Sequence, residues 1–262
     1  KMPESGVFTD DLRESLILNK CDIVVHSWKD LPLDLGNETI IAGTLPRADQ
    51  RDILFVKKNH LSKISRNNTI SIFSSSPRRV YNLQLFVKNY LPFEIKKINF
   101  MDIRGNIPTR FKKFIEGNED AFIVAKAAID RLLKSEFSGF NDLSKMIRTY
   151  IEKCAWTITP LSINPTSPGQ GALACEVRKD DNHSRELIES INVEDDYKCA
   201  HKERKVLEQY GGGCHQKIGV SFFNTHFGVM HASRGEIEEG KEFHYWKKEN
   251  SKTKFKNNIK AK

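Results

Sequence analysis

A lysine and an aspartate stand directly behind an apolar, strand-like run in VVHSWKDLP, residues 24–32. In α/β folds, functional side chains gather on the loops just past buried strands, which makes Lys29 and Asp30 candidates for chemistry. A carboxylate there can serve as a general acid or base if its surroundings raise its pKa. The competing interpretation is a solvated turn, which is the commoner role of an arbitrary Lys-Asp pair.

Two arginines open a predicted helix in SIFSSSPRRV, where Pro77 suits the first helical position and Ser75 or Ser76 can cap it. The helix dipole disfavours the cations of Arg78 and Arg79 in this first turn. An anion bound at the helix N-terminus would offset that penalty, because hydroxyls, backbone N–H groups and guanidiniums would converge on it. The alternative is a pair of ordinary surface arginines.

A second junction of the same kind follows in MDIRGNIPTRF, where Gly105 turns the chain and Pro108 opens a helix. Arg104 and Arg110 bracket this junction. Two pairs of arginines at two strand–helix junctions favour a ligand with several carboxylates or phosphates, and the planar guanidinium fork suits such groups. Neither junction carries the glycine-rich patterns GxxxxGK[ST] or GxGxxG, so a nucleotide is not indicated.

Three further stretches belong beside these junctions. Arg131 lies on a helix predicted after the strand AFIVA, where an ordinary surface arginine is the competing interpretation. Gln170 stands between Gly169 and Gly171, which is typical of a tight crossover or a hinge between domains. In EQYGGGCHQKIG three glycines precede Cys214, and glycine is usual where the backbone turns sharply or something large comes close. This run indicates that the chain clears room around one thiol.

An alternation of strands and helices has to position these residues. We expect strands at 21–27, 68–76, 96–104 and 120–125, and helices at 10–19, 77–90, 108–117 and 126–137. The alternation predicts an α/β sheet covered by helices, with the ligand beyond the carboxyl ends of the strands.

The chain changes character from about residue 195. A helix at 195–210 has acidic residues at its start and an apolar face. Two antiparallel strands, at 217–223 and 227–233 and joined around 224–225, are predicted to follow it. This region is expected to form a small α+β domain.

Composition places the 262-residue chain among soluble globular proteins, with a formal net charge of +8. It contains no apolar run long enough for a membrane span and no signal-peptide pattern at its start, so a cytoplasmic protein is expected. The five cysteines form no CxxC pair and are odd in number, which disfavours a disulfide scaffold or a structural zinc site.

Six motifs together resemble those of the hydroxymethylbilane synthase family, also called porphobilinogen deaminase. In chain order they read VHSWKDLP, SSSPRR, IRGNIPTR, AAIDRL, GQGALACEVR and ERKVLEQYGGGCHQKIG. The resemblance implies a transferase of tetrapyrrole and haem biosynthesis that joins four porphobilinogen molecules into linear hydroxymethylbilane with release of ammonia. It also implies a dipyrromethane cofactor, which primes the reaction and is bound through a thioether to Cys214.

The fold implied by this resemblance has two periplasmic-binding-protein-like (type II) α/β domains and a small C-terminal α+β domain. Domain 1 is expected at 1–45 with 172–189 returning to it, domain 2 at 46–171, and the cysteine-bearing domain at 190–262. Lys1 aligns behind the family's first strand and first helix, so part of domain 1 is expected to be missing.

Roles for individual residues also follow from the resemblance. Asp30 is expected to be the catalytic residue, which stabilises the developing pyrrole cation and moves protons. Residues expected to bind the cofactor are Cys214, Lys29, Ser27, Ser74, Ser75, Ser76, Arg78, Arg79, Arg104, Gly105, Arg110 and Gln170. Residues expected to bind the substrate, which carries an acetate and a propionate, are Arg78, Arg104, Arg110 and Arg131. No metal is expected.

The partners implied are porphobilinogen as substrate and uroporphyrinogen-III synthase as recipient of the product, with a monomeric enzyme and no membrane. One alternative is a catalytically impaired or non-catalytic protein of the same fold that binds anions or pyrroles. A second alternative is nucleic-acid binding driven by the net charge, but the sequence carries no nucleic-acid motif.

Overall fold

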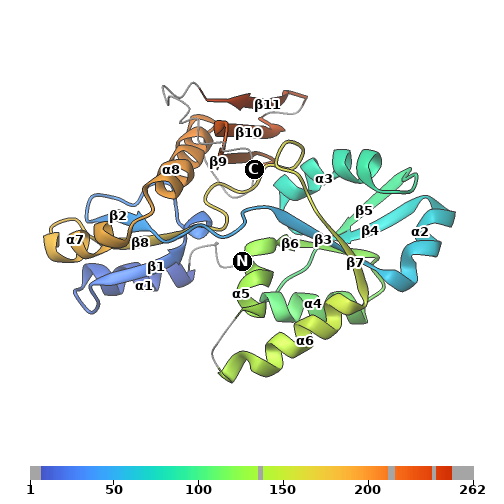
Figure 1. Cartoon of the computed structure of the whole chain (residues 1–262), viewed down its shortest axis with the longest axis horizontal. Helices are drawn as coiled ribbons and strands as arrows, with labels where there is room; N and C mark the ends of the chain where they lie inside the picture. Colours follow the sequence, from blue (N-terminus) through green and yellow to red (C-terminus); the bar gives the residue numbers. More distant parts are fainter. Residues whose placement is uncertain (1–6, 135–137, 212–215, 238–239, 250–262) are drawn as a thin grey trace, which may run out of the picture.

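The computed structural model describes residues 7–134, 138–211, 216–237 and 240–249 of the chain. Three β-sheets organise these residues, each with helices packed against it (Figure 1). The predicted mixed α/β class is confirmed. None of the helices in the described ranges is long and apolar enough to cross a membrane.

The first sheet contains three strands in the order β1-β8-β2, and both pairings are antiparallel. Its elements are β1 (Ile23–Ser27), β2 (Thr39–Thr44), β8 (Leu173–Arg178), α1 (Val7–Ile17) and α7 (Asn182–Ile191). The short 3-10 helix η1 (Trp28–Asp30) follows β1 directly and carries the predicted Lys-Asp pair.

The second sheet contains five strands in the order β5-β4-β6-β3-β7. Its strands are β3 (Asp52–Lys57), β4 (Thr69–Phe73), β5 (Lys97–Met101), β6 (Ala121–Ala125) and β7 (Cys154–Ile158). Its helices are α2 (Leu61–Asn67), α3 (Pro77–Tyr90), α4 (Ile107–Glu116), α5 (Lys126–Leu133) and α6 (Asn141–Glu152). β4 runs parallel to β5 and β6, whereas β3 is antiparallel to both of its neighbours.

In the sequence of strand β3, apolar residues follow one another and do not alternate with polar ones. Its six residues are all buried, because helices cover both faces of the sheet. Leu54 and Val56 pack into the cluster on the side of α3, and Ile53 and Phe55 pack into the cluster on the side of α4 and α6. The two halves of the core therefore share this strand.

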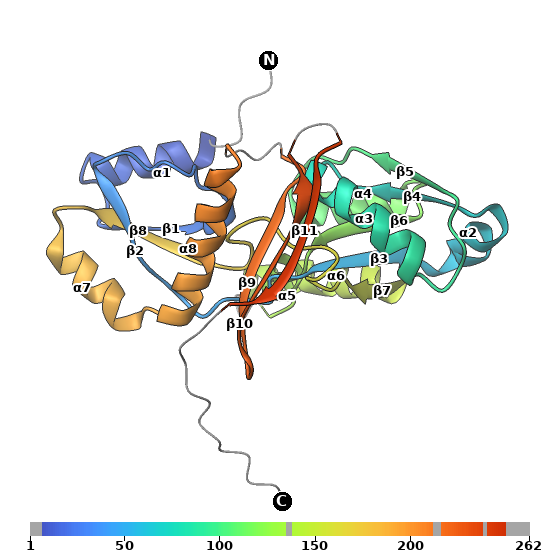
Figure 2. The ribbon, with the colours of Figure 1, turned by 90° about the horizontal axis from the view of Figure 1, so that it is seen from above.

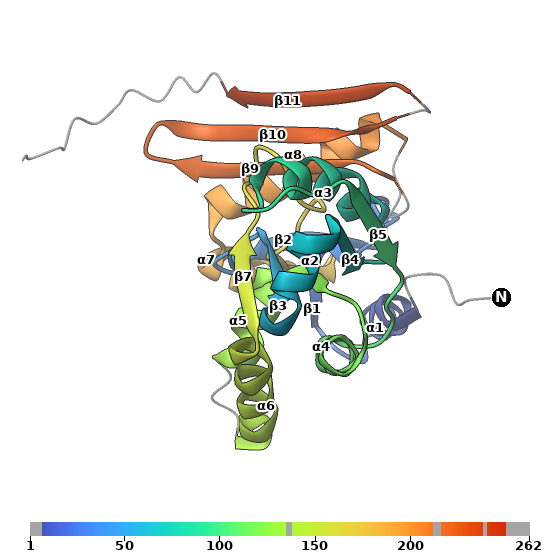
Figure 3. The same cartoon turned by 90° about the vertical axis from the view of Figure 1, so that its right-hand side faces the viewer.

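The third sheet, in the order β11-β10-β9, is antiparallel and follows helix α8. Its elements are α8 (Glu194–Gln209), β9 (Gly219–Thr225), β10 (Gly228–Glu236) and β11 (Glu242–Lys248). Figure 2 shows this sheet between the other two, and Figure 3 shows α3 and α8 beneath it. Arg234 of β10 fixes α3 through a 3.0 Å hydrogen bond from its Nη1 to Asn82 Oδ1.

The chain crosses between the first two sheets twice, at 45–51 and at 159–172. A backbone hydrogen bond of 3.2 Å from Ala48 N–H to the carbonyl oxygen of Gly171 ties the two crossings together. Gly171 has a φ of +86°, and a Cβ there would lie 2.5 Å from the Ala48 oxygen. Only glycine fits this contact, because an L side chain would be strained as well as obstructed.

Each strand and helix predicted from the sequence has a counterpart in the structure, and the helix predicted at 77–90 has the observed bounds of α3. The predicted turn around Asn224 and Thr225 is wrong by two positions, because Thr225 pairs with Gly228 and the loop is His226–Phe227. Gly228 takes the positive φ of +109° that this tight reversal requires. The helix predicted at 126–137 ends at Leu133 as α5, and residues 135–137 lie outside the described ranges.

Candidate functional site

The carboxyl ends of three parallel strands meet at one edge of the second sheet. Helix α3 follows β4, α4 follows β5, and α5 follows β6, so the predicted arginines of all three segments come to this edge. This is where ligands bind in open α/β sheets. Because β3 runs antiparallel to β6, its first residue, Asp52, pairs with Ala125 at the same edge.

The Lys-Asp pair faces this region from the first sheet, on a loop that the C-terminal helix holds in place. Trp28 is 2% exposed and packs against Tyr197 of α8, with ring centroids 5.3 Å apart. Arg204 of α8 donates from Nη1 to the carbonyl oxygens of Trp28 (3.1 Å) and Leu31 (3.2 Å), and from Nη2 to Pro32. Helix α8, which precedes Cys214 in the chain, therefore also fixes the loop of Lys29 and Asp30.

Gly169 brings the second crossing against the same loop. Its φ is +78°, and a Cβ there would lie 3.1 Å from the backbone nitrogen of Lys29 and 3.2 Å from the carbonyl carbon of Trp28. The predicted hinge residue Gln170 is 1% exposed and follows directly. Its Nε2 donates to Asp52 Oδ1 at 2.8 Å and to the carbonyl oxygen of Gln50 at 2.7 Å, so both crossings meet at Gln170.

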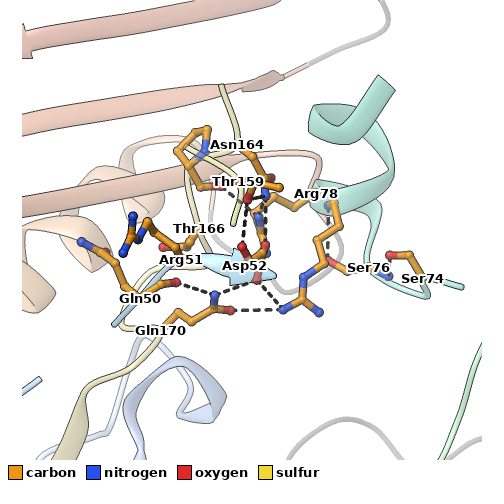
Figure 4. A network of polar contacts seen from close by, with 12 residues as sticks. Gln50, Arg51, Asp52, Ser74, Ser76, Arg78, Thr159, Asn164, Thr166 and Gln170 are labelled. Carbon is orange, nitrogen blue, oxygen red and sulfur yellow. Dashed lines mark hydrogen bonds and ion pairs between the residues drawn. The ribbon is translucent and has the colours of Figure 1, made fainter. Parts of the chain in front are cut away.

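Asp52 is the centre of the polar network in Figure 4. Its side chain is fully buried, and it accepts from Arg78 Nη2 (2.9 Å) and Arg79 Nη2 (2.8 Å). Burial alone would raise the pKa of the Asp52 carboxyl, but the charges of Arg79 and Arg78 more than offset this and lower it. Asp52 is therefore ionised and supplies the two arginines with a counter-ion from within the fold.

This pairing corrects part of the sequence interpretation. Arg78 was expected either to hold a ligand or to lie on the surface, yet it is 4% exposed and bound to internal acceptors. The cap of α3 is Ser76, whose Oγ accepts from Arg79 N–H, while Ser75 instead exchanges hydrogen bonds with the backbone of Ile103. The penalty for two cations at a helix N-terminus is thus offset by Asp52 as well as by any ligand.

Positive charge remains in excess around this carboxylate. Among the described residues, none of Lys29, Arg104 and Arg110 forms an ion pair. Loss of hydration lowers the pKa of Lys29; nearby Asp30 opposes this and Arg79 adds to it. Burial, with the charges of Arg79 and Arg104, lowers the pKa of Arg110. These cations lie close enough to repel one another, which is the electrostatics of an anion site.

The remaining predicted residues occupy three kinds of position. Arg131 is exposed and donates from Nη2 to the carbonyl oxygen of Gly171 at 3.0 Å, so it contacts the second crossing. Gly105 is exposed with a φ of +119°, and its carbonyl oxygen accepts from Arg110 Nε at 2.5 Å. Ser74 is buried behind the α3 N-terminus, and Ser27 is half-buried at the end of β1. Cys214 lies outside the described residues.

A cavity of about 420 Å³ opens between the Lys29 loop, the start of α3 and the end of α8. Its polar lining includes Lys29, Ser76 and Arg78, and its apolar lining includes Leu31 and Ile218. Gly211 and Gln216, which border the stretch containing Cys214, also line it. Cationic groups beside apolar walls suit a ligand that combines ring faces with carboxylates. The described residues contain no cluster of three or more His, Cys, Asp or Glu side chains that could hold a metal ion.

Sequence reasoning missed the residues that tie this site together. Asp52 carries a local signal, since an aspartate directly before the apolar run at 53–56 is expected to be buried with a partner. Glu203 and Arg47 form a buried ion pair with 2.8 Å between Glu203 Oε2 and Arg47 Nη2. They lie 156 residues apart, and no local pattern links them.

The chain is similar in sequence to known proteins of one family. The sequence model described as "Porphobilinogen deaminase, dipyromethane cofactor binding domain" matches residues 1–186. A protein named porphobilinogen deaminase from Chlorobium phaeovibrioides is 34% identical over 232 residues, covering 88% of this chain. One from Chloroherpeton thalassium is 34% identical over 220 residues, covering 84%. The chain spans 65% and 62% of the lengths of these two relatives.

Solved structures that match include an ABC transporter protein from Parabacteroides distasonis. It is 12% identical, with a TM-score of 0.42, and the match covers 90% of this chain and 72% of that one. Family membership follows from the sequence matches, because the family model covers more than half of the chain. The chain belongs to the porphobilinogen deaminase family.

Proposed function

We propose that this protein is a hydroxymethylbilane synthase, a transferase that links four porphobilinogen molecules head to tail and releases four ammonias. The observation that carries the proposal is the excess of cationic side chains at the carboxyl edge of the second sheet, facing Lys29 and Asp30. A growing chain of pyrroles adds two carboxylates per ring, and arginines position and neutralise such a polyanion.

The roles of the chain's own residues follow from this placement. Asp30 is exposed on η1, and among the described residues no side chain or N–H group donates to its carboxylate, so it is free to meet a substrate. Its carboxylate would hold the pyrrole N–H and take up or deliver protons as each ammonia leaves. Lys29, Arg79, Arg104 and Arg110 would bind carboxylates, and Arg131 would act at the second crossing.

The cofactor assigned here is dipyrromethane, attached by a thioether to Cys214. It would supply the free pyrrole carbon to which the first substrate is joined. The cavity fits this group, because it combines apolar walls with Lys29 and Arg78, and Gly211 and Gln216 on either side of the Cys214 stretch line it. Cys154 and Cys199 do not suit the attachment, since burial raises the pKa of these thiols to about 11 and about 12.

We also propose the three-domain division: 1–45 with 172–189, then 46–171, then 190–262. The two crossings would act as the hinge between the first two domains, because the hydrogen bonds of Ala48, Gln170 and Gly171 concentrate there. Handover of the product to uroporphyrinogen-III synthase and a monomeric state complete the proposal.

The intact mass of the purified protein tests the function. We expect an excess over the sequence mass equal to two pyrrole units, which Cys214→Ala removes. Cys21→Ala is the matched control and should keep the excess, because Cys21 lies in the connection between α1 and β1 and is not among the described residues that line the cavity. A bare-chain mass together with porphobilinogen binding but no turnover would instead support a non-catalytic pyrrole-binding protein.

The lowered pKa of Lys29 predicts how substrate binding responds to alkali. A depressed pKa means that the ammonium loses its proton at a lower pH than a free lysine, whose ordinary pKa is 10.5. We therefore expect the KM for porphobilinogen to rise several-fold between about pH 7 and about pH 9.5. Lys29→Arg should flatten this rise, since a guanidinium stays charged throughout. An equal rise in wild type and Lys29→Arg would remove Lys29 from carboxylate binding.

A further inference from the structure

The two oxygens of Asp52 serve different partners. Oδ2 accepts from Arg78 Nη2 at 2.9 Å and from Asn164 Nδ2 at 3.1 Å. Oδ1 accepts from Arg79 Nη2 at 2.8 Å and from Gln170 Nε2 at 2.8 Å. One buried carboxylate therefore joins both arginines of the α3 N-terminus to the two crossings. Figure 4 shows Asp52 with Arg78, Asn164 and Gln170 around it.

Arg78 is held by the interior of the protein. Its side chain is 5% exposed, and besides Asp52 it donates from Nη1 to Asn164 Oδ1 (3.1 Å) and to the carbonyl oxygen of Pro165 (2.9 Å). Both terminal nitrogens of its guanidinium are thus engaged within the fold. Removing its counter-ion would leave a buried charge without compensation, which is strongly destabilising.

Arg79 is held on one side only. Its side chain is 12% exposed, and the contacts to Asp52 Oδ1 and to Gln170 Oε1 (3.4 Å) both use Nη2. Its charge contributes to the lowered pKa values of both Lys29 and Arg110, so it lies near both of these cations. It has donors left for a carboxylate, and its neighbours attract one.

We propose that Asp52 is a positioning residue for ligand carboxylates and that it acts through Arg79. Its Oδ1 fixes the guanidinium in one orientation, and its negative charge competes with the ligand for that guanidinium. The site then holds a polyanion in register without holding it so tightly that the growing chain cannot advance. The proposed function enters only in naming the ligand as a chain of carboxylate-bearing pyrroles.

Asp52→Asn, which preserves shape and removes the charge, tests this role. Citrate serves as a simple polycarboxylate probe, with binding measured by calorimetry at low salt and below the unfolding midpoint of every variant. We expect citrate to bind about 3- to 10-fold more tightly, because one competing negative charge is gone. We expect kcat for porphobilinogen to fall about tenfold, because Arg79 is no longer oriented.

Asp49→Asn is the matched control. Asp49 also pairs with an arginine and lies three residues away on the first crossing. Its partners Arg51 and Lys126 have side chains 45% and 24% exposed, and neither side chain forms an ion pair with Asp52. Citrate affinity and kcat should both stay within about twofold of wild type. A lowered unfolding midpoint of Asp52→Asn is expected in either case because Arg78 loses its counter-ion. Citrate affinity that is unchanged or weaker in Asp52→Asn would mean a purely structural role for Asp52 and would overturn the proposal.

A second variant decides the matter if Asp52→Asn does not fold. Arg79→Met should weaken citrate binding at least about tenfold, because it removes the cation that Asp52 positions. Citrate affinity within twofold of wild type in Arg79→Met would refute the proposal. Wild-type protein that fails to consume porphobilinogen would count against the proposed function, while the citrate measurements would still decide the role of Asp52.

Discussion

Asp30→Asn is expected to lower the turnover of porphobilinogen by about 10²- to 10⁴-fold, the usual contribution of a general acid or base. The amide keeps the size of the side chain and one acceptor oxygen, but it cannot take up a proton at neutral pH. The loop itself should not move, because Trp28 and the three carbonyl oxygens bound by Arg204 hold it, and none of these contacts involves the Asp30 side chain. The excess mass of the cofactor should therefore remain.

Asp34→Asn provides the control for that experiment. Asp34 is also exposed, lies four residues further along the same loop, and uses its carboxylate to cap the backbone N–H of Gly36 at 2.8 Å. Turnover in this variant should stay close to wild type. Near-normal turnover in Asp30→Asn, with the cofactor attached, would exclude Asp30 as the proton-transfer group.

The parts of the site that could be predicted from sequence are those with a local physical signature. Pro77 and the serines before it predict a helix start, and Gly105 with Pro108 predicts the next one. The positions of Arg78, Arg79, Arg104 and Arg110 at strand–helix junctions follow from these signals alone. That the junctions meet at one edge follows from the parallel pairing of β4 with β5 and β6, which alternating strands and helices favour.

The internal partners of these residues could not be predicted in the same way. Asp52 neutralises Arg78 because β3 enters the sheet antiparallel to β6, and that direction depends on a crossing from the first sheet. The residues at 53–56 are all apolar, and this pattern does not indicate the strand's direction. Only the structure shows which arginine is free to meet a ligand. The side chain of Arg79 is 12% exposed, and that of Arg78 is 5% exposed.

Helix α8 illustrates the same limit and leads to the second large prediction. Consecutive residues on it hold two different parts of the site: Arg204 binds the Lys29 loop, and Glu203 binds the first crossing. Both Glu203 oxygens accept from Arg47, at 2.9 Å and 2.8 Å. They also accept from the backbone N–H groups of Gly169 and Phe222, each at 2.7 Å. This one carboxylate joins both crossings to β9.

Glu203→Gln is expected to lower the free energy of unfolding by about 3–5 kcal/mol, as measured by denaturant titration. The substitution leaves Arg47, whose side chain is 6% exposed, without its counter-ion. It also replaces an acceptor oxygen by an NH₂ group that must face N–H donors, so at least two hydrogen bonds are lost. Both effects act at the Glu203 side chain, which is fully buried, so water cannot replace the lost interactions.

Glu208→Gln on the same helix separates this effect from a general loss of helix charge. Glu208 is exposed and makes no ion pair with a described residue, so its amide should change the unfolding free energy by no more than about 0.5 kcal/mol. A loss below about 1 kcal/mol in Glu203→Gln would mean that water or a moved side chain replaces the carboxylate. The crossings would then be held mainly by Asp52 and Gln170, and the C-terminal helix would support the Lys29 loop without fixing the hinge.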